Sequence, residues 1–151
     1  MTEDHEKFIR RSIVLAEVSM KKGNEPFGAL LVIDGEIIYE AENIIYSERD
    51  CTGHAETNLL RLASMQFDAE TMARATMYTS TEPCIMCCGA AYWSGIKRIV
   101  FGCSEEALKE IAGDSMLIPS REVLARGVRK IEVIGPILEE ESLALHRRYW
   151  K

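Results

Sequence analysis

Apolar residues near the start of the chain predict a helix followed by two strands. Their offsets of 4, 3 and 4 are typical of one helical face, formed by Ile9, Ile13, Ala16 and Met20. We expect Gly23-Asn24 to end this helix. The apolar run 28–33 then predicts a strand, and Asp34-Gly35 predicts a tight turn into a second strand over residues 36–40.

The rest of the chain alternates between predicted helices and strands, without a repeat or a linker. We expect further strands over residues 76–80, 98–103 and 130–134. We expect further helices from about residue 53, from 82 to about 93, and over 104–112, 121–126 and 138–149, with a loop at 113–120. This order predicts a single domain over residues 1–151 of the α/β class, a three-layer sandwich with a five-stranded mixed sheet between helices.

Composition excludes several classes of protein. The chain has 151 residues, of which 47% are hydrophobic and 28% charged, a balance typical of a globular rather than a disordered protein. Its 24 acidic and 18 basic residues give a net charge of −6, which disfavours a general nucleic-acid binder because such affinity depends on cationic contacts to phosphates. No apolar run approaches the ~18 residues that a membrane span needs, and the polar first ten residues do not resemble a secretory signal. The odd cysteine count of five favours a reducing compartment, so we expect a cytoplasmic protein.

Two short motifs carry candidate metal ligands. His54-Ala55-Glu56 begins one predicted helix, and Pro83-Cys84-Ile85-Met86-Cys87 begins another. Cys84 and Cys87 are three residues apart on a helix, so their sulfurs project from one face. One imidazole and two thiolates are ligands that zinc prefers, and three protein ligands leave the fourth position open, as in catalytic sites. The sequence therefore predicts one catalytic Zn²⁺ per subunit, held by His54, Cys84 and Cys87.

Glu56 is the candidate catalytic residue beside this metal. It follows His54 by two residues, so its side chain leaves the helix in another direction, toward a bound water or the substrate. Zinc lowers the pKa of a bound water to around 7, and we expect Glu56 to act as general base and then general acid toward the ring nitrogen and the departing amine. Each motif alone is weak, and a structural metal or plain core packing is the alternative interpretation.

The combination His-x-Glu and Pro-Cys-x-x-Cys resembles the cytidine-deaminase-like superfamily of zinc-dependent deaminases, over residues 8–103. The resemblance implies a hydrolytic deaminase in which a five-stranded mixed sheet packs against helices. It also implies that the two motif helices carry the zinc and that Glu56 is the proton shuttle. Because members commonly form dimers, we expect a homodimer.

Two further segments, 26–29 and 89–93, are similar to guanine deaminases. Asn43, which lies 11 residues before His54, also matches an asparagine of that family. By this resemblance Asn43 hydrogen-bonds the base, although an asparagine in a loop could instead bond its own turn. Two aromatic residues are candidates for stacking on the ring or for core packing, and an acid in the loop after the fourth strand is a candidate acceptor. The candidate substrate-binding residues are Asn43, Phe27, Asp114, Trp93 and Ala55.

Two features depart from guanine deaminases. Residues 50–53 lack the loop sequence usual in guanine deaminases, and the tail 131–150 is more like the end of tRNA adenosine deaminases and cytosine deaminases. A small basic cluster, His146-Arg147-Arg148, would suit RNA, but cations are also common at a helix C-terminus. We expect deamination of a free small-molecule nucleobase, a guanine-like ring first and cytosine second. The alternatives are a tRNA adenosine-to-inosine deaminase and a non-catalytic zinc-stabilised binding module.

Overall fold

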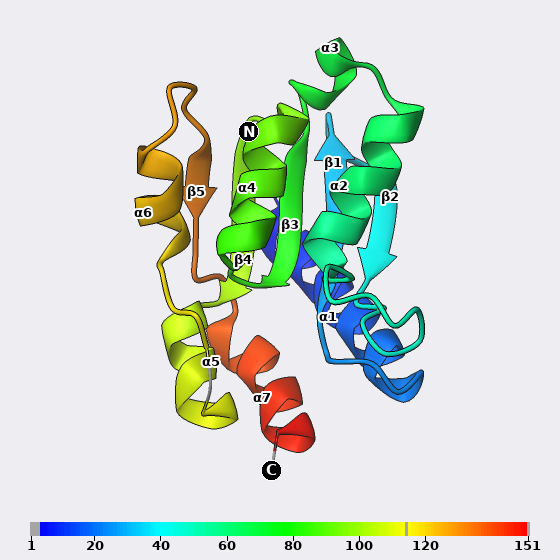
Figure 1. The fold of residues 1–151 in the computed structure, drawn as a ribbon, viewed down its shortest axis with the longest axis vertical. Helices are drawn as coiled ribbons and strands as arrows, with labels where there is room; N and C mark the ends of the chain where they lie inside the picture. Colours follow the sequence, from blue (N-terminus) through cyan, green and yellow to red (C-terminus); the bar gives the residue numbers. More distant parts are fainter. Residues whose placement is uncertain (1–3, 114, 151) are drawn as a thin grey trace.

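The computed structural model describes residues 4–113 and 115–150, and five strands within them form one sheet (Figure 1). The sheet order is β2-β1-β3-β4-β5. β1 runs antiparallel to both β2 and β3, whereas β3, β4 and β5 are parallel, so the predicted mixed sheet is confirmed. The strands are β1 (Gly28–Ile33), β2 (Glu36–Glu42), β3 (Thr76–Thr81), β4 (Arg98–Cys103) and β5 (Glu132–Ile134).

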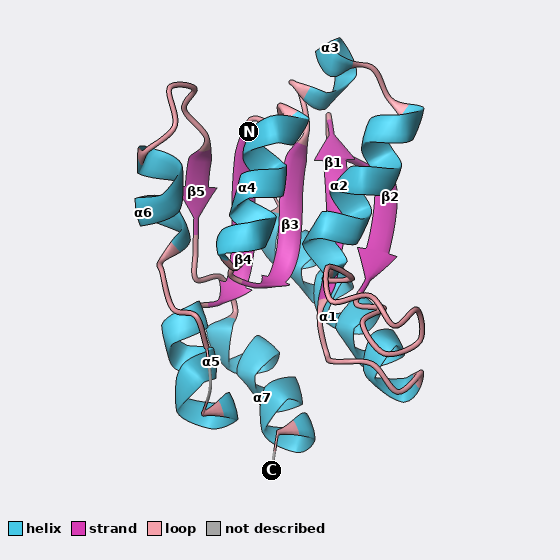
Figure 2. Cartoon of the chain, in the orientation of Figure 1, coloured by secondary structure: helices cyan, strands magenta, loops and turns pink. Residues whose placement is uncertain are grey.

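Helices cover both faces of this sheet, which gives the expected three layers (Figure 2). On one face α1 packs against β1 and β3, and α7 against β4; on the other α2 packs against β1 and β2, with α4 beside it and α6 next to α4. None of the helices in the described residues is both long and apolar enough to cross a membrane. The helices are α1 (His5–Lys21), α2 (Ala55–Gln66), α3 (Ala69–Met72), α4 (Ile85–Ser94), α5 (Glu105–Ala112), α6 (Ser120–Ala125) and α7 (Glu139–Tyr149).

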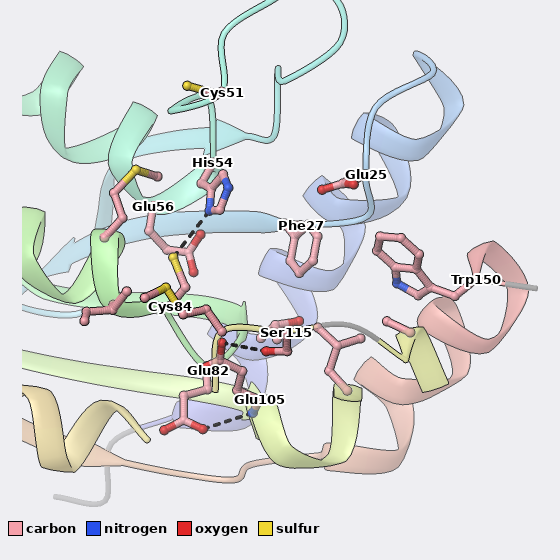
Figure 3. Close-up of a pocket in the computed structure, with 16 residues that line it drawn as sticks. Glu25, Phe27, Cys51, His54, Glu56, Glu82, Cys84, Glu105, Ser115 and Trp150 are labelled. Carbon is pink, nitrogen blue, oxygen red and sulfur yellow. Dashed lines mark hydrogen bonds between the residues drawn. The ribbon is translucent and has the colours of Figure 1, made fainter. Parts of the chain in front are cut away.

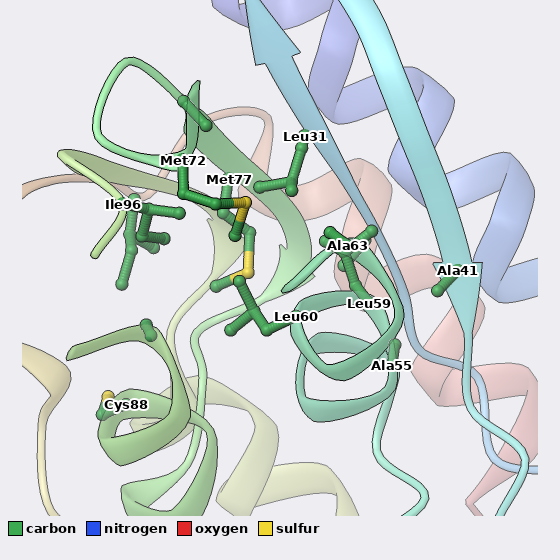
Figure 4. Packing of buried hydrophobic residues seen from close by; sticks show 14 of the residues in the cluster. Leu31, Ala41, Ala55, Leu59, Leu60, Ala63, Met72, Met77, Cys88 and Ile96 are labelled. Atoms are coloured by element: carbon green, nitrogen blue, oxygen red, sulfur yellow. The ribbon is translucent and has the colours of Figure 1, made fainter. Parts of the chain in front are cut away.

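The fully buried strand β1 separates two hydrophobic clusters. Its side chains alternate, as in any strand, so Leu31 joins the cluster beneath α2 and α4 (Figure 4). Leu30 points the other way and joins the cluster beneath α1. Burial on both faces explains why the sequence of β1 is continuously apolar rather than alternating. The first cluster holds the helices that begin at the two sequence motifs.

The inner face of α1 differs from the predicted stripe. Ser12 and Ser19 are buried, whereas Ile13 and Met20 are only partly buried. The reason is close packing, because a Cβ added at Gly28 of β1 would lie 2.4 Å from the Ser12 carbonyl oxygen. Small side chains fit this contact, and their hydroxyls are satisfied by backbone carbonyls at 2.6 Å. The short helix α3 was not predicted either, since it contains only four residues.

Candidate metal and substrate site

Both sequence motifs lie at helix N-termini that meet beyond the carboxyl end of β3. His54 is the N-cap residue of α2, and Cys84 is the N-cap residue of α4, three residues after β3 ends. Neither side chain caps its own helix, so the imidazole and the thiol are free to point elsewhere. The positive ends of two helices therefore converge on one place, which favours thiolate and other negative charge there.

Three side chains in this place form a cluster that could hold a metal ion. The ligand atoms of His54, Cys84 and Cys87 all lie within 4.8 Å of one another. His54 Nδ1 is 3.5 Å from Cys84 Sγ (Figure 3). It is 3.7 Å from Cys87 Sγ. The donor set of one imidazole nitrogen and two sulfurs fits Zn²⁺ and leaves one tetrahedral position open. Sequence analysis did not identify Thr57, which donates a hydrogen bond to Cys87 Sγ at 3.2 Å.

The two neighbouring thiols have pKa values that shift in opposite directions. The contacts of Cys84 with Cys87 and with His54 lower the pKa of Cys84. The contact with Cys84, together with burial, raises the pKa of Cys87. Of the two sulfurs, Cys84 Sγ therefore more readily takes the thiolate form, which is the form that binds a metal ion.

Glu56 lies in the first turn of α2 and is 4% exposed. Burial raises the pKa of its carboxyl to about 7, and the thiolate of Cys84 adds to this shift, while His54 opposes it. A carboxyl that ionises near neutral pH can both accept and return a proton under ordinary conditions. The position and environment of Glu56 therefore suit acid–base chemistry next to the metal ligands.

A cavity of about 480 Å³ opens beside these residues (Figure 3). Its walls are mostly apolar, with four glutamates among the lining residues. Such a volume is in the range of small-molecule sites. The residues that line it are Glu25, Phe27, Cys51, His54, Glu56, Thr81, Glu82, Cys84, Ile85, Met86, Glu105, Leu108, Ala112, Ser115, Met116 and Trp150.

The predicted substrate-binding residues fall into different places. Phe27 lines the cavity, and the buried Asn43 donates a backbone hydrogen bond to the Phe27 carbonyl at 3.0 Å. Asn43 Oδ1 accepts a hydrogen bond from the amide of Ile45 at 3.1 Å. This is the bond to its own turn that the sequence offered as the alternative to a contact with the base. Asp114 lies outside the described residues.

Two of the predicted contacts require correction. Ala55 is fully buried in the cluster beneath α2 rather than in the cavity wall. Trp93 is 85% exposed on α4 and does not line the cavity. The reason is helical geometry, because nine residues turn a helix by about two and a half turns, which places Trp93 opposite Cys84.

Sequence analysis missed a buried polar group at the start of α5. The Glu82 carboxylate accepts hydrogen bonds from the amide of Glu105 at 3.0 Å, and from the amide of Ser120 at 2.8 Å and its hydroxyl at 2.5 Å. Glu82 thereby ties the segment before Cys84 to the N-termini of α5 and α6. Ser115 in turn donates to Glu105 Oε1 at 3.1 Å. Only the folded chain brings these residues together, so no local pattern could have indicated them.

His146 also differs from its expected place in a basic surface cluster. Its ring is 1% exposed and packs 5.2 Å from the ring of Phe27. Trp150 Nε1 donates to His146 Nδ1 at 3.1 Å, and His146 Nε2 lies 2.7 Å from Thr81 Oγ1. Burial lowers the pKa of His146 to about 4, so the ring is neutral at pH 7 and holds Trp150 at the cavity.

Comparisons with known proteins agree with this geometry. A family model for the cytidine and deoxycytidylate deaminase zinc-binding region matches residues 2–103. A probable cytosine deaminase of Schizosaccharomyces pombe is 35% identical over 99% of this chain and 94% of its own. A tRNA-specific adenosine deaminase of Bacillus subtilis is 35% identical over 93% and 84%. The solved structure of a guanine deaminase from Nitrosomonas europaea has a TM-score of 0.80 and 25% identity, covering 94% of this chain and 82% of its own. The names of these three proteins give three different substrates, namely cytosine, tRNA adenosine and guanine.

Proposed function

Because the chain belongs to the cytidine and deoxycytidylate deaminase zinc-binding family, we propose that it is a hydrolytic deaminase of a free aminated nucleobase, a guanine-like ring or cytosine. It is a zinc-dependent deaminase by family. The single observation that carries the choice of a free base is the small cavity lined by four glutamates beside the metal ligands.

The residues have separate roles in this proposal. His54, Cys84 and Cys87 hold the zinc, which supplies an activated water when it is bound. Glu56 would carry both protons of the attacking water: the first goes to the ring nitrogen, and the second, from the hydroxyl group of the addition product, goes to the departing amine. Phe27, which precedes β1 and lines the cavity, and Asn43, which follows β2 and bonds the Phe27 carbonyl, orient the ring, and ammonia leaves as the product.

The electrostatics of the site favour a free base over RNA. Glu25, Glu56, Glu82 and Glu105 line one cavity, and phosphates would be repelled by any of them that are ionised. The predicted basic cluster is smaller than expected, since His146 is buried and Arg147 pairs with Glu140 at 3.1 Å. A net charge of −6 adds to this repulsion.

Ammonia release from a panel of free bases tests the proposal. The zinc-loaded protein is expected to release ammonia from guanine, cytosine or a related aminated ring. Glu56→Gln is expected to keep its zinc and to lose about 100- to 10,000-fold in kcat. The control variant Glu106→Gln, which makes the same change at an exposed position of α5, should keep full activity. Failure to turn over any base overturns the proposal. A fully active Glu56→Gln variant would refute the assigned role of that residue. A parent protein that turns over no base, and whose properties Glu56→Gln leaves unchanged, would favour a binding module.

A second candidate is tRNA-specific adenosine deamination, which the 35% identity to the Bacillus subtilis enzyme over 93% of the chain supports. Inosine formation in an anticodon stem-loop would establish it. The absence of salt-sensitive RNA binding would count against it, because phosphate contacts make such binding depend on salt. The homodimer also stays a prediction, which light scattering on the purified chain can check.

A further inference from the structure

A glutamate that lines the cavity has one carboxylate oxygen without a hydrogen-bond partner. Glu105 is the first residue of α5, is 5% exposed and lines the cavity. Among the described residues, only Glu105 Oε2 and Glu42 Oε2 are buried side-chain oxygens or nitrogens without a hydrogen bond. Glu42 does not line the cavity, so Glu105 carries the one such oxygen at the site.

The rest of Glu105 is held firmly. Its backbone amide donates to Glu82, and its Oε1 accepts from the Ser115 hydroxyl. Ser104 caps α5 by accepting from the amide of Ala107 at 3.1 Å. The Glu105 carboxylate therefore cannot turn to find another partner without losing the contact to Ser115. An oxygen fixed in this way is an acceptor prepared for a donor from outside the chain.

A buried oxygen without a donor is costly, and such groups are uncommon in folded proteins. Burial raises the pKa of Glu105 to about 7, with a smaller contribution from the charge of Cys84, so the carboxylate gains from any donor that approaches it. Figure 3 shows Glu105 and Ser115 on one side of the cavity and His54 on the opposite side. A ring whose amino-bearing carbon faces the metal ligands would turn its far edge toward Glu105.

We propose that Glu105 Oε2 accepts the ring N–H at the far edge of the bound base, at the nitrogen that carries the sugar in a nucleoside. This inference rests on the proposed function and names a specificity-determining residue for it. In cytosine that donor is N1–H, and in guanine it is the imidazole N–H. A nucleoside has no proton there and carries a bulky sugar instead. Glu105 thereby selects free bases over nucleosides and nucleic acids.

Equilibrium binding separates this role from chemistry. In the zinc-loaded Glu56→Gln background, which does not turn over, the free base is compared by calorimetry with its analogue methylated at that nitrogen, 1-methylcytosine or 9-methylguanine. The background is expected to bind the free base about 10- to 100-fold more tightly, since a charged acceptor is left unpaired by the analogue. Adding Glu105→Ala, which removes the acceptor and leaves room for the methyl group, is expected to reduce the ratio to within about threefold.

Two further variants guard against a folding defect. Glu105→Gln keeps the volume and is expected to weaken binding of the free base about tenfold or more, while the matched Glu106→Gln changes neither affinity. In the active protein, Glu105→Gln is expected to raise KM more than it lowers kcat.

Three results would overturn the inference. Unchanged affinities in both Glu105 variants exclude a contact, and an equal loss for the base and its methylated analogue indicates a structural role. A methylated analogue that binds the background as well as the free base excludes the assigned nitrogen. In each case ammonia release by the parent protein leaves the proposed function standing, whereas a parent that neither binds nor turns over any base refutes both.

Discussion

Removing the Glu56 carboxylate is expected to abolish activity and, in the metal-free protein, to raise stability. Glu56 is 4% exposed, and burial raises its pKa from the unfolded value of 4.5 to about 7. Glutamine has nearly the same shape and carries no proton to lose. Glu56→Gln therefore isolates the free energy of keeping an ionised carboxylate in this cavity.

The magnitude follows from the two pKa values. Between them the native state keeps a proton that the unfolded chain has already released, so stability is full below pH 4.5 and falls as the pH rises through 7. A shift of two to three pKa units at about 1.4 kcal/mol each gives about 3 kcal/mol. The metal-free Glu56→Gln variant should exceed the parent by about 3 kcal/mol near pH 8 and by less than about 1 kcal/mol near pH 5.

Urea unfolding of metal-free, reduced protein at these two pH values measures the difference. Glu106→Gln is the matched control, because it makes the same chemical change at an exposed position of α5. The parent and this control should agree at both pH values. A Glu56→Gln variant that is less stable than the parent near pH 8, or whose advantage does not depend on pH, would refute the reasoning from burial.

Three further predictions follow from the site and the core. Cys87→Ser should reduce bound zinc well below about one per chain by metal analysis, whereas Cys88→Ser, whose sulfur bonds a backbone carbonyl, should keep it. Gly28→Ala should lower the free energy of unfolding by about 2 kcal/mol or more, since its Cβ would lie 2.4 Å from a backbone oxygen; Gly89→Ala, with nothing within 4 Å, should raise it by about 0.5–1 kcal/mol in the same urea titration. His146 has its pKa lowered from 6.5 to about 4 by burial, so its own contribution to the free energy of unfolding should fall by up to about 3 kcal/mol as the pH falls through this window, opposite in sign to that of Glu56. His146→Gln should lose less over that range, and parallel losses would contradict a buried neutral ring.

Local patterns predicted the sheet well because its strands are bounded by turns. The spans of β1 and β4 match the expected ones, and Asp34 and Gly35 both have positive φ, as the hairpin signal requires. The face of α1 was less predictable. Ser12 is buried where α1 approaches β1 closely, and Ser19 where its hydroxyl bonds the Asn43 carbonyl; both contacts join segments distant in the sequence.

The site divides in the same way. His54, Glu56, Cys84 and Cys87 stand in short motifs, so the sequence alone indicated the metal cluster. Glu105 gives no such signal, because an acid in the first turn of a helix is ordinary in sequence and becomes unusual only when folding buries it. Trp93 shows the converse. The segment 89–93 is similar to guanine deaminases and so indicated a substrate contact, but Trp93 lies on the exposed side of α4, away from the cavity.

Glu56 and Glu105 both lower the stability of the folded chain near neutral pH. Each is buried, and burial raises the pKa of each to about 7. An apolar or amide side chain of similar size would fill either position without this cost, as helix and core packing require no charge there. Strain of this kind persists where function needs it and is uncommon elsewhere. The two glutamates line one cavity, so the same argument supports both proposed roles, proton transfer for Glu56 and ligand binding for Glu105.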